Sequence, residues 1–156
     1  MNREELQFLP VSINIRRKKI LIIGGGKVAF HKATVLSRFS CKAKVIAPRF
    51  YPGFEDLPFE LIPREYTAGD LDGAFLVYIC TGDEALNASV KASCEERGIL
   101  ASVCDNPLLC DFISPAIHQE GYLTVAVSSD ARNVRRSIDI RNRIRTLFEN
   151  KTIKIK

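Results

Sequence analysis

Three consecutive glycines, Gly24 to Gly26, have the spacing in this chain that most clearly predicts chemistry. They follow the apolar run 20–23 and continue to Ala29 in the pattern Gly-x-Gly-x-x-Ala. In this pattern the first glycine allows a tight turn, the second leaves room for a pyrophosphate, and the small third residue lets a helix pack on the strand. The amides and the positive dipole end of that helix face the anion. We therefore predict a dinucleotide contact at Gly24, Gly25, Gly26, Lys27 and Val28.

The second strand bears on the choice of dinucleotide. A standard NAD site has an Asp or Glu at the end of this strand, where it holds the ribose 2'-hydroxyl. Here the strand 43–47 is followed by Pro48 and Arg49. Arg49 would favour a 2'-phosphate and hence NADP, or it is a solvated loop residue. These residues alone leave NAD and NADP both open.

The elements that must position this turn alternate as in a doubly wound α/β domain. We expect strands at 18–23, 43–47, 59–63, 75–80 and 100–103, with helices over 27–39 and 83–97. Ligands of such sheets bind beyond the carboxyl ends of the strands. The glycine turn, the run Thr81, Gly82 and Asp83, and the carboxylate of Asp105 should therefore line one cleft.

The chain's 156 residues, 46% of them hydrophobic, suffice for one well-buried domain with an extension. From residue 112 the pattern changes to two strands at 112–117 and 122–127, followed by an amphipathic helix over 134–148. We therefore expect a Rossmann-like doubly wound parallel sheet over 1–111, and over 112–156 a β-hairpin and helix for dimerisation that also face the substrate. Exposed hairpin edges tend to be covered by a partner chain, so we expect a homodimer.

Several classes of protein are disfavoured. No apolar run approaches the ~20 residues of a membrane span, and the N-terminus does not resemble a signal peptide, so we expect a cytoplasmic protein without a membrane partner. The five cysteines are odd in number and lack Cys-x-x-Cys spacing, which predicts reduced thiols and no zinc site. His31 and His118 are expected at the surface, and no metal site is predicted.

The basic charge is concentrated at the end of the chain. Residues 131–156 hold nine Lys or Arg against two acidic residues. This segment has no interleaved aromatic residues for base stacking and no recognition-helix motif, so we do not expect a nucleic-acid partner. A surface that meets an acidic small molecule or an acidic partner fits this charge better.

Eight short segments carry a family resemblance. They are 9–11, 22–29, 32–33, 45–48, 81–87, 103–107, 110–116 and 125–129. Together they resemble the siroheme synthase N-terminal domain family, whose members are precorrin-2 dehydrogenases and, in some cases, sirohydrochlorin ferrochelatases. The resemblance implies NAD as the cofactor, because this family commonly has Ala-Pro, here Ala47 and Pro48, where other dinucleotide domains have an acid.

The resemblance also implies a catalytic role for Asp105, which would take a proton as a tetrapyrrole substrate, precorrin-2, is oxidised to sirohydrochlorin. From the residues alone, an Asp before Asn106 and Pro107 is more typical of a turn than of a catalytic group. Asp111 is a second acid nearby, and we expect it to cap a helix or the hairpin.

The chain departs from the family pattern after Ser129, where a single helix replaces the helical region of longer members. Iron insertion is therefore less well supported than the fold. Two other functions stay open: a different NAD(P)-dependent oxidoreductase, or a non-enzymatic dinucleotide-sensing regulatory domain. The run from Asp105 to Pro107 argues against the sensor.

Overall fold

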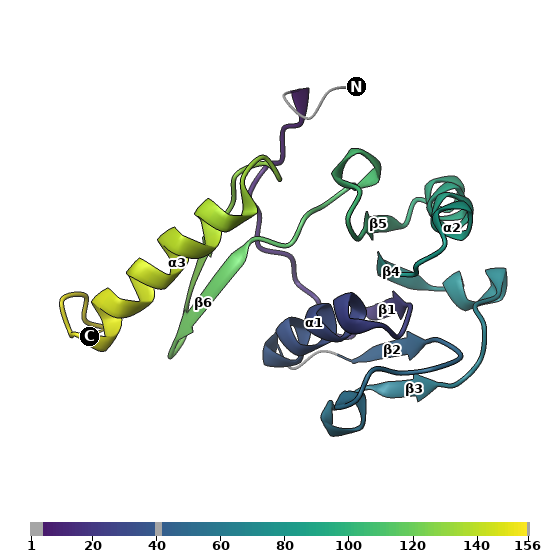
Figure 1. The fold of residues 1–156 in the computed structure, drawn as a ribbon, viewed down its shortest axis with the longest axis horizontal. Helices are drawn as coiled ribbons and strands as arrows, with labels where there is room; N and C mark the ends of the chain where they lie inside the picture. Colours follow the sequence, from purple (N-terminus) through teal and green to yellow (C-terminus); the bar gives the residue numbers. More distant parts are fainter. Residues whose placement is uncertain (1–4, 40–41, 156) are drawn as a thin grey trace. The chain divides into compact units, whose positions relative to one another are not determined.

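The computed structural model describes residues 5–39 and 42–155, and the chain divides into two units. One unit runs from Ser12 to Phe112, and the other joins the described residues up to Val11 to those from Ile113 onward (Figure 1). Within the second unit the Phe8 amide donates to Asp130 at 3.2 Å, and Arg132 donates to the carbonyl of Leu6. This partition differs from the expected division at 111/112 mainly in the N-terminal segment. The roles assigned to 1–111 and 112–156 stay predictions.

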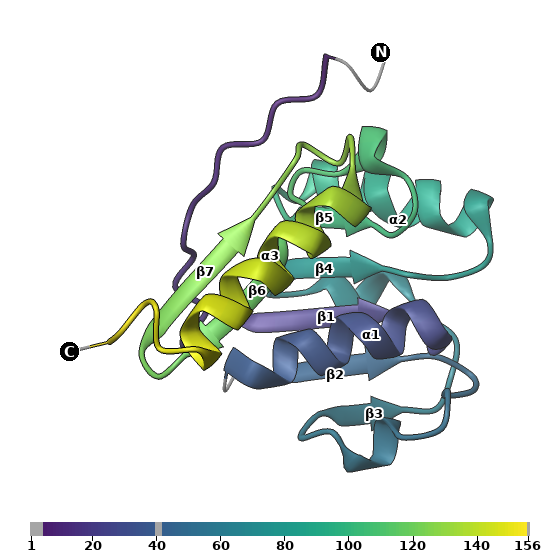
Figure 2. The same cartoon turned by 60° about the vertical axis from the view of Figure 1, so that its left-hand side comes forward.

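The first unit is built on a five-stranded parallel sheet in the order β3-β2-β1-β4-β5 (Figure 2). The strands are β1 Lys19–Ile23, β2 Ala43–Ile46, β3 Glu60–Ile62, β4 Ala74–Ile79 and β5 Leu100–Val103. The strand order reverses direction between β1 and β4, so this is the switch point where doubly wound sheets bind ligands. The Rossmann-like α/β fold expected from the sequence is confirmed.

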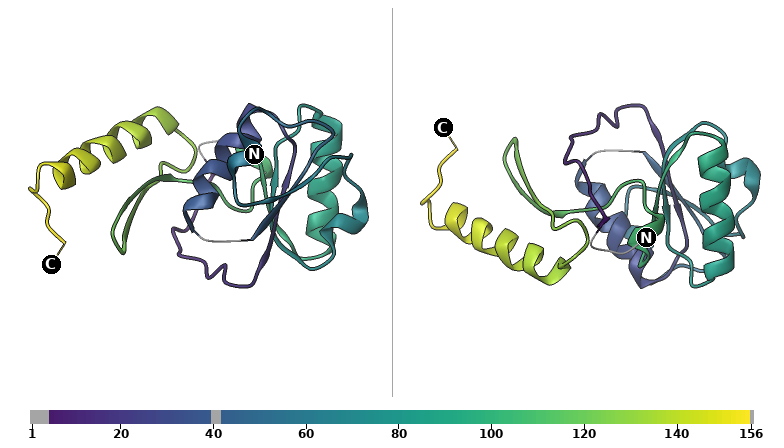
Figure 3. Two further views of the ribbon diagram at one scale, coloured as in Figure 1. Left: turned by 90° about the horizontal axis from the view of Figure 1, so that it is seen from below. Right: turned by 90° about the horizontal axis from the view of Figure 1, so that it is seen from above.

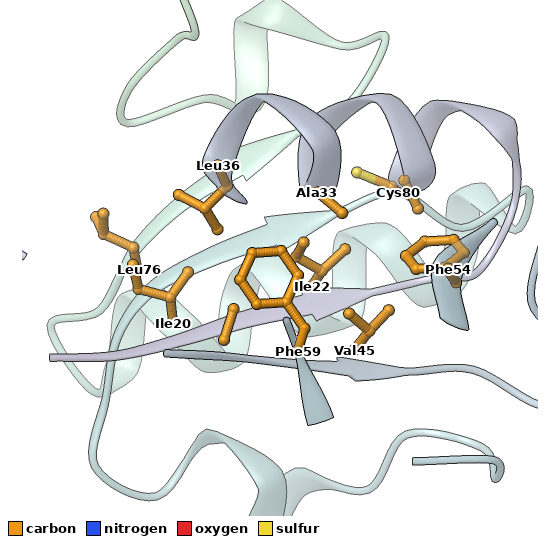
Figure 4. Packing of buried hydrophobic residues seen from close by; sticks show 11 residues of the cluster. Ile20, Ile22, Ala33, Leu36, Val45, Phe54, Phe59, Leu76 and Cys80 are labelled. Carbon is orange, nitrogen blue, oxygen red and sulfur yellow. The ribbon is translucent and has the colours of Figure 1, made fainter. Parts of the chain in front are cut away.

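Alternate residues of β1 serve the two faces of this sheet. Ile20 and Ile22 pack in the cluster that contains Ala29 and Ala33 of α1, Lys27–Leu36 (Figure 4). Leu21 and Ile23 belong to a second cluster, with Val90 and Cys94 of α2, Glu84–Glu96. All four β1 side chains are buried. A strand covered on both faces explains the continuous apolar run before the glycines.

Helix α1 is shorter than the expected 27–39. It ends at Leu36 and continues as a 3-10 turn, Ser37–Phe39. The Ser37 hydroxyl donates to the carbonyl of Thr34 at 2.8 Å, which is the local hydrogen bonding by which serine competes with a regular helix.

The second unit contains an antiparallel hairpin of β6 Ala116–Glu120 and β7 Leu123–Val127. The expected first strand, 112–117, was wrong at its start, because β6 begins only after Pro115, which lacks an amide hydrogen. Gly121 and Tyr122 make the turn, with Gly121 at a φ of +56°.

Helix α3, Val134–Glu149, lies along the hairpin (Figure 3). The His118 ring lies 5.4 Å from that of buried Phe148, and Arg141 donates to the carbonyl of Ile117 at 2.8 Å. The surface position expected for His118 was wrong, since its side chain is only 12% exposed. Over 5–39 and 42–155 no helix combines the length and apolar character needed to cross a bilayer.

Candidate functional site: a dinucleotide turn beside an exposed carboxylate

The glycine turn has two crowded positions and one open one. Gly24 has a φ of +120°, and a Cβ there would collide with the carbonyl oxygen of Cys80. At Gly25 a Cβ would lie 2.8 Å from the Ala47 Cβ and would collide with the Arg49 carbonyl oxygen. At Gly26, no atom of the described residues lies within 4 Å of the Cβ position. The turn therefore leaves space at the glycine expected to face a pyrophosphate.

The N-terminus of α1 is suited to an anion. Gly26 is its N-cap, and no side chain in the described part of the chain bonds to the free amides at this cap. The first turn carries no acidic residue, and Lys27 and Val28 are exposed there. Unbonded amides at the positive end of a helix dipole bind phosphate groups. Gly26, Lys27 and Val28 thus fit the pyrophosphate of a dinucleotide.

The end of β2 closes against this turn. The Gly24 amide donates to the Ile46 carbonyl at 2.9 Å, and the Tyr51 amide donates to the Gly25 carbonyl at 2.7 Å. Ala47 is buried, whereas Pro48 is exposed. The sequence offers no carboxylate between Ala47 and Gly53, so this loop lacks the usual acidic ligand for the ribose.

At the end of β4, the predicted residues Thr81 and Asp83 order the start of α2. The Asp83 carboxylate accepts a hydrogen bond from the Leu86 amide at 3.0 Å, which makes Asp83 the N-cap. The Thr81 hydroxyl donates to Asn87, whose amide nitrogen donates back to the Thr81 carbonyl at 3.1 Å. Gly82 is the exposed residue between them. Sequence reasoning used Asn87 only as part of the family resemblance, because its hydrogen bonds to Thr81 depend on how α2 packs on the sheet.

Asp105 lies in the turn that follows β5, one residue beyond Cys104, and it is exposed. Its φ of +70° is in the left-handed region, which Asp adopts more readily than most residues. The Asn106 amide donates to the Val103 carbonyl at 3.2 Å and so fixes the turn around Asp105. An exposed carboxylate on an ordered turn at a strand end can exchange protons with a bound ligand.

Lys32 on α1 is electrostatically coupled to this carboxylate. Burial lowers the pKa of the Lys32 ammonium, and the charges of Cys110 and Asp105 offset part of that change. Sequence reasoning used Lys32 only as part of the family resemblance. Its approach to Asp105 depends on the packing of α1 on the sheet and has no signal in local spacing.

Asp111 anchors the segment after Asp105. Its carboxylate accepts hydrogen bonds from Lys91 at 2.8 and 3.0 Å and from the Ala101 amide at 2.9 Å. Burial lowers the pKa of Lys91, but the hydrogen bonds to Asp111 and Glu95 outweigh it, so its pKa is raised overall. The expected capping role of Asp111 was therefore wrong, because Lys91 reaches it from α2.

The sulfurs of Cys80 and Cys104 are joined by a disulfide. The expectation of reduced thiols was wrong for this pair, because Ile79 and Val103 are in register and place the next residue of each strand side by side. Cys94 and Cys110 are free thiols, and Cys41 lies outside the described residues.

These contacts bring the predicted segments to one edge of the sheet. Gly24 packs against Cys80, Cys80 is bonded to Cys104, and Asp105 follows directly. The glycine turn, the segment from Thr81 to Asp83 and Asp105 are therefore neighbours at the carboxyl ends of β1, β4 and β5. Across 5–39 and 42–155 no three His, Cys, Asp or Glu side chains are arranged to hold a metal ion.

A pyrophosphate turn at the switch point of a doubly wound sheet defines a class of dinucleotide-binding domain. A family model for NAD(P)-binding domains, NAD_binding_7, matches residues 11–116. The chain belongs to this family. The match confirms the prediction of a nicotinamide dinucleotide cofactor.

More particular relatives are siroheme synthases. The chain is 40% identical over 126 residues to the siroheme synthase of Ectopseudomonas mendocina, and 37% identical over 128 residues to that of Azotobacter vinelandii. Each alignment covers 80% of this chain, and the chain spans only 27% and 28% of these curated relatives. These matches confirm the resemblance to siroheme synthases.

A solved structure has the same fold. SirC, a precorrin-2 dehydrogenase, superposes with a TM-score of 0.76 at 19% identity, covering 89% of this chain and 70% of that one. At this identity the likeness establishes the architecture, including the hairpin and helix that follow the sheet.

Proposed function

We propose that this chain is an NAD-dependent dehydrogenase that oxidises precorrin-2 to sirohydrochlorin. The observation that carries the proposal is the exposed carboxylate of Asp105 at the same sheet edge as the open position at Gly26. The similarity to siroheme synthases supports the choice of substrate. A nucleotide sensor would need the glycine turn but no carboxylate beside it.

The oxidation removes two electrons and two hydrogens from the macrocycle. NAD, when bound, accepts one hydrogen with both electrons as a hydride. The carboxylate of Asp105 accepts the other as a proton, which general base catalysis requires to be within hydrogen-bonding reach. The amides after Gly26 hold the pyrophosphate and so orient the cofactor, while the Lys32 ammonium is near enough to Asp105 to be stabilised by its charge.

The cofactor in this proposal is NAD rather than NADP. The loop after β2 places buried Ala47 against the turn, and the next residue, Pro48, is exposed and carries no charge. The backbone carbonyl of Arg49 packs against Gly25. Calorimetry with both dinucleotides tests the choice, and tighter binding of NADP would reject it.

The proposed assembly is a homodimer formed through the second unit, in the cytoplasm. Helix α3 leaves Val134 61% exposed, and the hairpin leaves Tyr122 78% exposed. Exposed apolar side chains, together with a hairpin whose two strands pair only with each other among the described residues, favour association with a second copy. Light scattering should give twice the 17.5 kDa of one chain, and a monomer at micromolar concentration would reject the dimer. Cell fractionation tests the location.

The direct test of the activity is anaerobic incubation with precorrin-2 and NAD, followed by absorbance of sirohydrochlorin and NADH. Equal amounts of both products support the proposal, and the absence of NADH formation rejects it. Adding Fe²⁺ to the same incubation tests iron insertion, in which Asp105 would accept the pyrrole protons.

A further inference from the structure

Cys80 and Cys104 occupy the first positions after β4 and β5, and their Cα atoms are 5.0 Å apart. This separation is within the usual range for disulfides. Backbone hydrogen bonds hold both residues independently of the sulfurs. The Cys104 amide donates to the Ile79 carbonyl and the Cys80 amide donates to the Ile23 carbonyl, each at 2.8 Å. The sheet therefore does not depend on the disulfide to keep these strand ends together.

The pair lies between the two halves of the proposed active site. Thr81 follows Cys80, and the Cys80 carbonyl packs against Gly24 of the dinucleotide turn. Asp105 follows Cys104. Cys104 is partly exposed whereas Cys80 is buried, so Cys104 is the member of the pair that a small thiol or disulfide would meet first.

We propose that Cys80 and Cys104 form a reversible redox site that regulates the dehydrogenase, an inference that rests on the proposed function. The oxidant is a small disulfide such as glutathione disulfide. The Cys104 thiolate attacks one of its sulfurs and releases one glutathione. The Cys80 thiolate then attacks the Cys104 sulfur and releases the second. Two electrons and two protons pass from the cysteine pair to two glutathione thiols, and reduction reverses both steps.

The bond changes the position of the carboxylate more than that of the dinucleotide turn. Two thiol sulfurs need more room than two bonded ones. Because the Cys104 amide stays bonded to the Ile79 carbonyl, we expect reduction to reorient the Cys104 side chain and the exposed turn beside it rather than to part the strand ends. Asp105 is the next residue and moves with that turn. Small displacements of a reacting group cost large factors in rate. Gly24 remains bonded to β2 through its amide, so the cofactor turn is preserved in both states.

The test is a redox titration of the purified chain in anaerobic glutathione buffers. In each buffer, alkylation with mass spectrometry measures the thiols, calorimetry measures NAD affinity, and the precorrin-2 assay measures turnover. We expect the pair to titrate as one two-electron couple. The oxidised form should turn over at least threefold faster, with an NAD Kd within twofold of the reduced form.

Three variants separate this role from general effects on folding. Cys80→Ser and Cys104→Ser should stay at the rate of the reduced wild type in every buffer. Cys94→Ala is the matched control and should respond as the wild type does. Cys94 is buried against the other face of the sheet, and burial raises its pKa to about 11, which makes it a poor nucleophile.

Each other outcome overturns the proposal. If the pair is never oxidised in these buffers, Cys80 and Cys104 are two neighbouring thiols without a redox role. If the disulfide resists reduction until the protein unfolds, it is a structural crosslink. A turnover rate independent of the redox state removes the regulatory role. If the pair titrates but neither form oxidises precorrin-2, the redox site exists and the proposed function fails. The thiol titration thus distinguishes failure of the proposed function from absence of the redox site.

Discussion

Replacement of Gly26 by aspartate tests the dinucleotide turn, because it should weaken NAD binding without lowering the stability of the fold. The Cβ position is free of neighbours within 4 Å among the described residues, and the backbone, at φ −79° and ψ −175°, suits any residue. Gly26 is the N-cap of α1, where Asp is a preferred residue. The variant should therefore fold, with a Tm equal to or above that of the wild type.

Binding should weaken because the new carboxylate faces the pyrophosphate. Two like charges about 4 Å apart repel by about 1 kcal/mol in bulk water and about 4 kcal/mol at the effective dielectric of a protein surface. The NAD Kd should thus rise by roughly fivefold to nearly a thousandfold. Calorimetry at low and high salt measures it, and part of the loss should be relieved by salt.

Two further variants separate charge from space and from packing. Gly26→Asn has nearly the same shape without the charge, so its loss of affinity reports the steric contribution. Gly25→Ala should instead destabilise the fold by about 1–3 kcal/mol, because its Cβ has no room beside Ala47 and Arg49. If Gly26→Asp folds and binds NAD as the wild type does, the anion does not lie at this turn and the reasoning is refuted.

Three other substitutions probe the remaining groups. Asp105→Asn should keep NAD affinity within twofold while kcat falls by about 100- to 10,000-fold, and a wild-type rate in the precorrin-2 assay would make Asp105 a turn residue. Asp111→Ala removes one partner of largely buried Lys91, which keeps Glu95, and should lower the free energy of unfolding by about 1.5–3 kcal/mol in urea titrations; an unchanged midpoint would contradict the anchoring role. Hydrogen bonds from Arg64 hold the pKa of Asp70 well below its usual value, so its contribution to stability is present above pH ~4 and is lost as the pH falls below that. Asp70→Asn should flatten this acid limb of the stability curve, and an unchanged slope would show that Asp70 does not cause it.

The parts of the site that were predicted from the sequence depend on local rules. The glycine turn is encoded by a buried strand, three glycines and a helix within a dozen residues, and the backbone of Gly24 and the space at Gly26 agree with that prediction. The position of Asp105 followed from the rule that ligands bind at strand ends. Its catalytic role stays a prediction.

The parts that were missed depend on register and helix packing. Cys80 and Cys104 are 24 residues apart, and only the pairing of β4 with β5 makes them neighbours. Lys91 reaches Asp111 from the buried side of α2, where its sequence neighbours suggest an ordinary surface lysine. Such contacts join elements distant in the chain, so no periodicity within one element predicts them.

The two hydrogen bonds between Asp111 and Ala101 protect part of a sheet edge from pairing with another chain. Strand β5 is the last of its sheet, and an edge strand offers unpaired amides and carbonyls to any other strand. The Asp111 amide donates to the Ala101 carbonyl, and the Asp111 carboxylate accepts from the Ala101 amide, each at 2.9 Å. One residue thus occupies the donor and the acceptor that a foreign strand would need at the middle of β5. The loop that carries Asp105 therefore also hinders the pairing of another strand with β5 at Ala101.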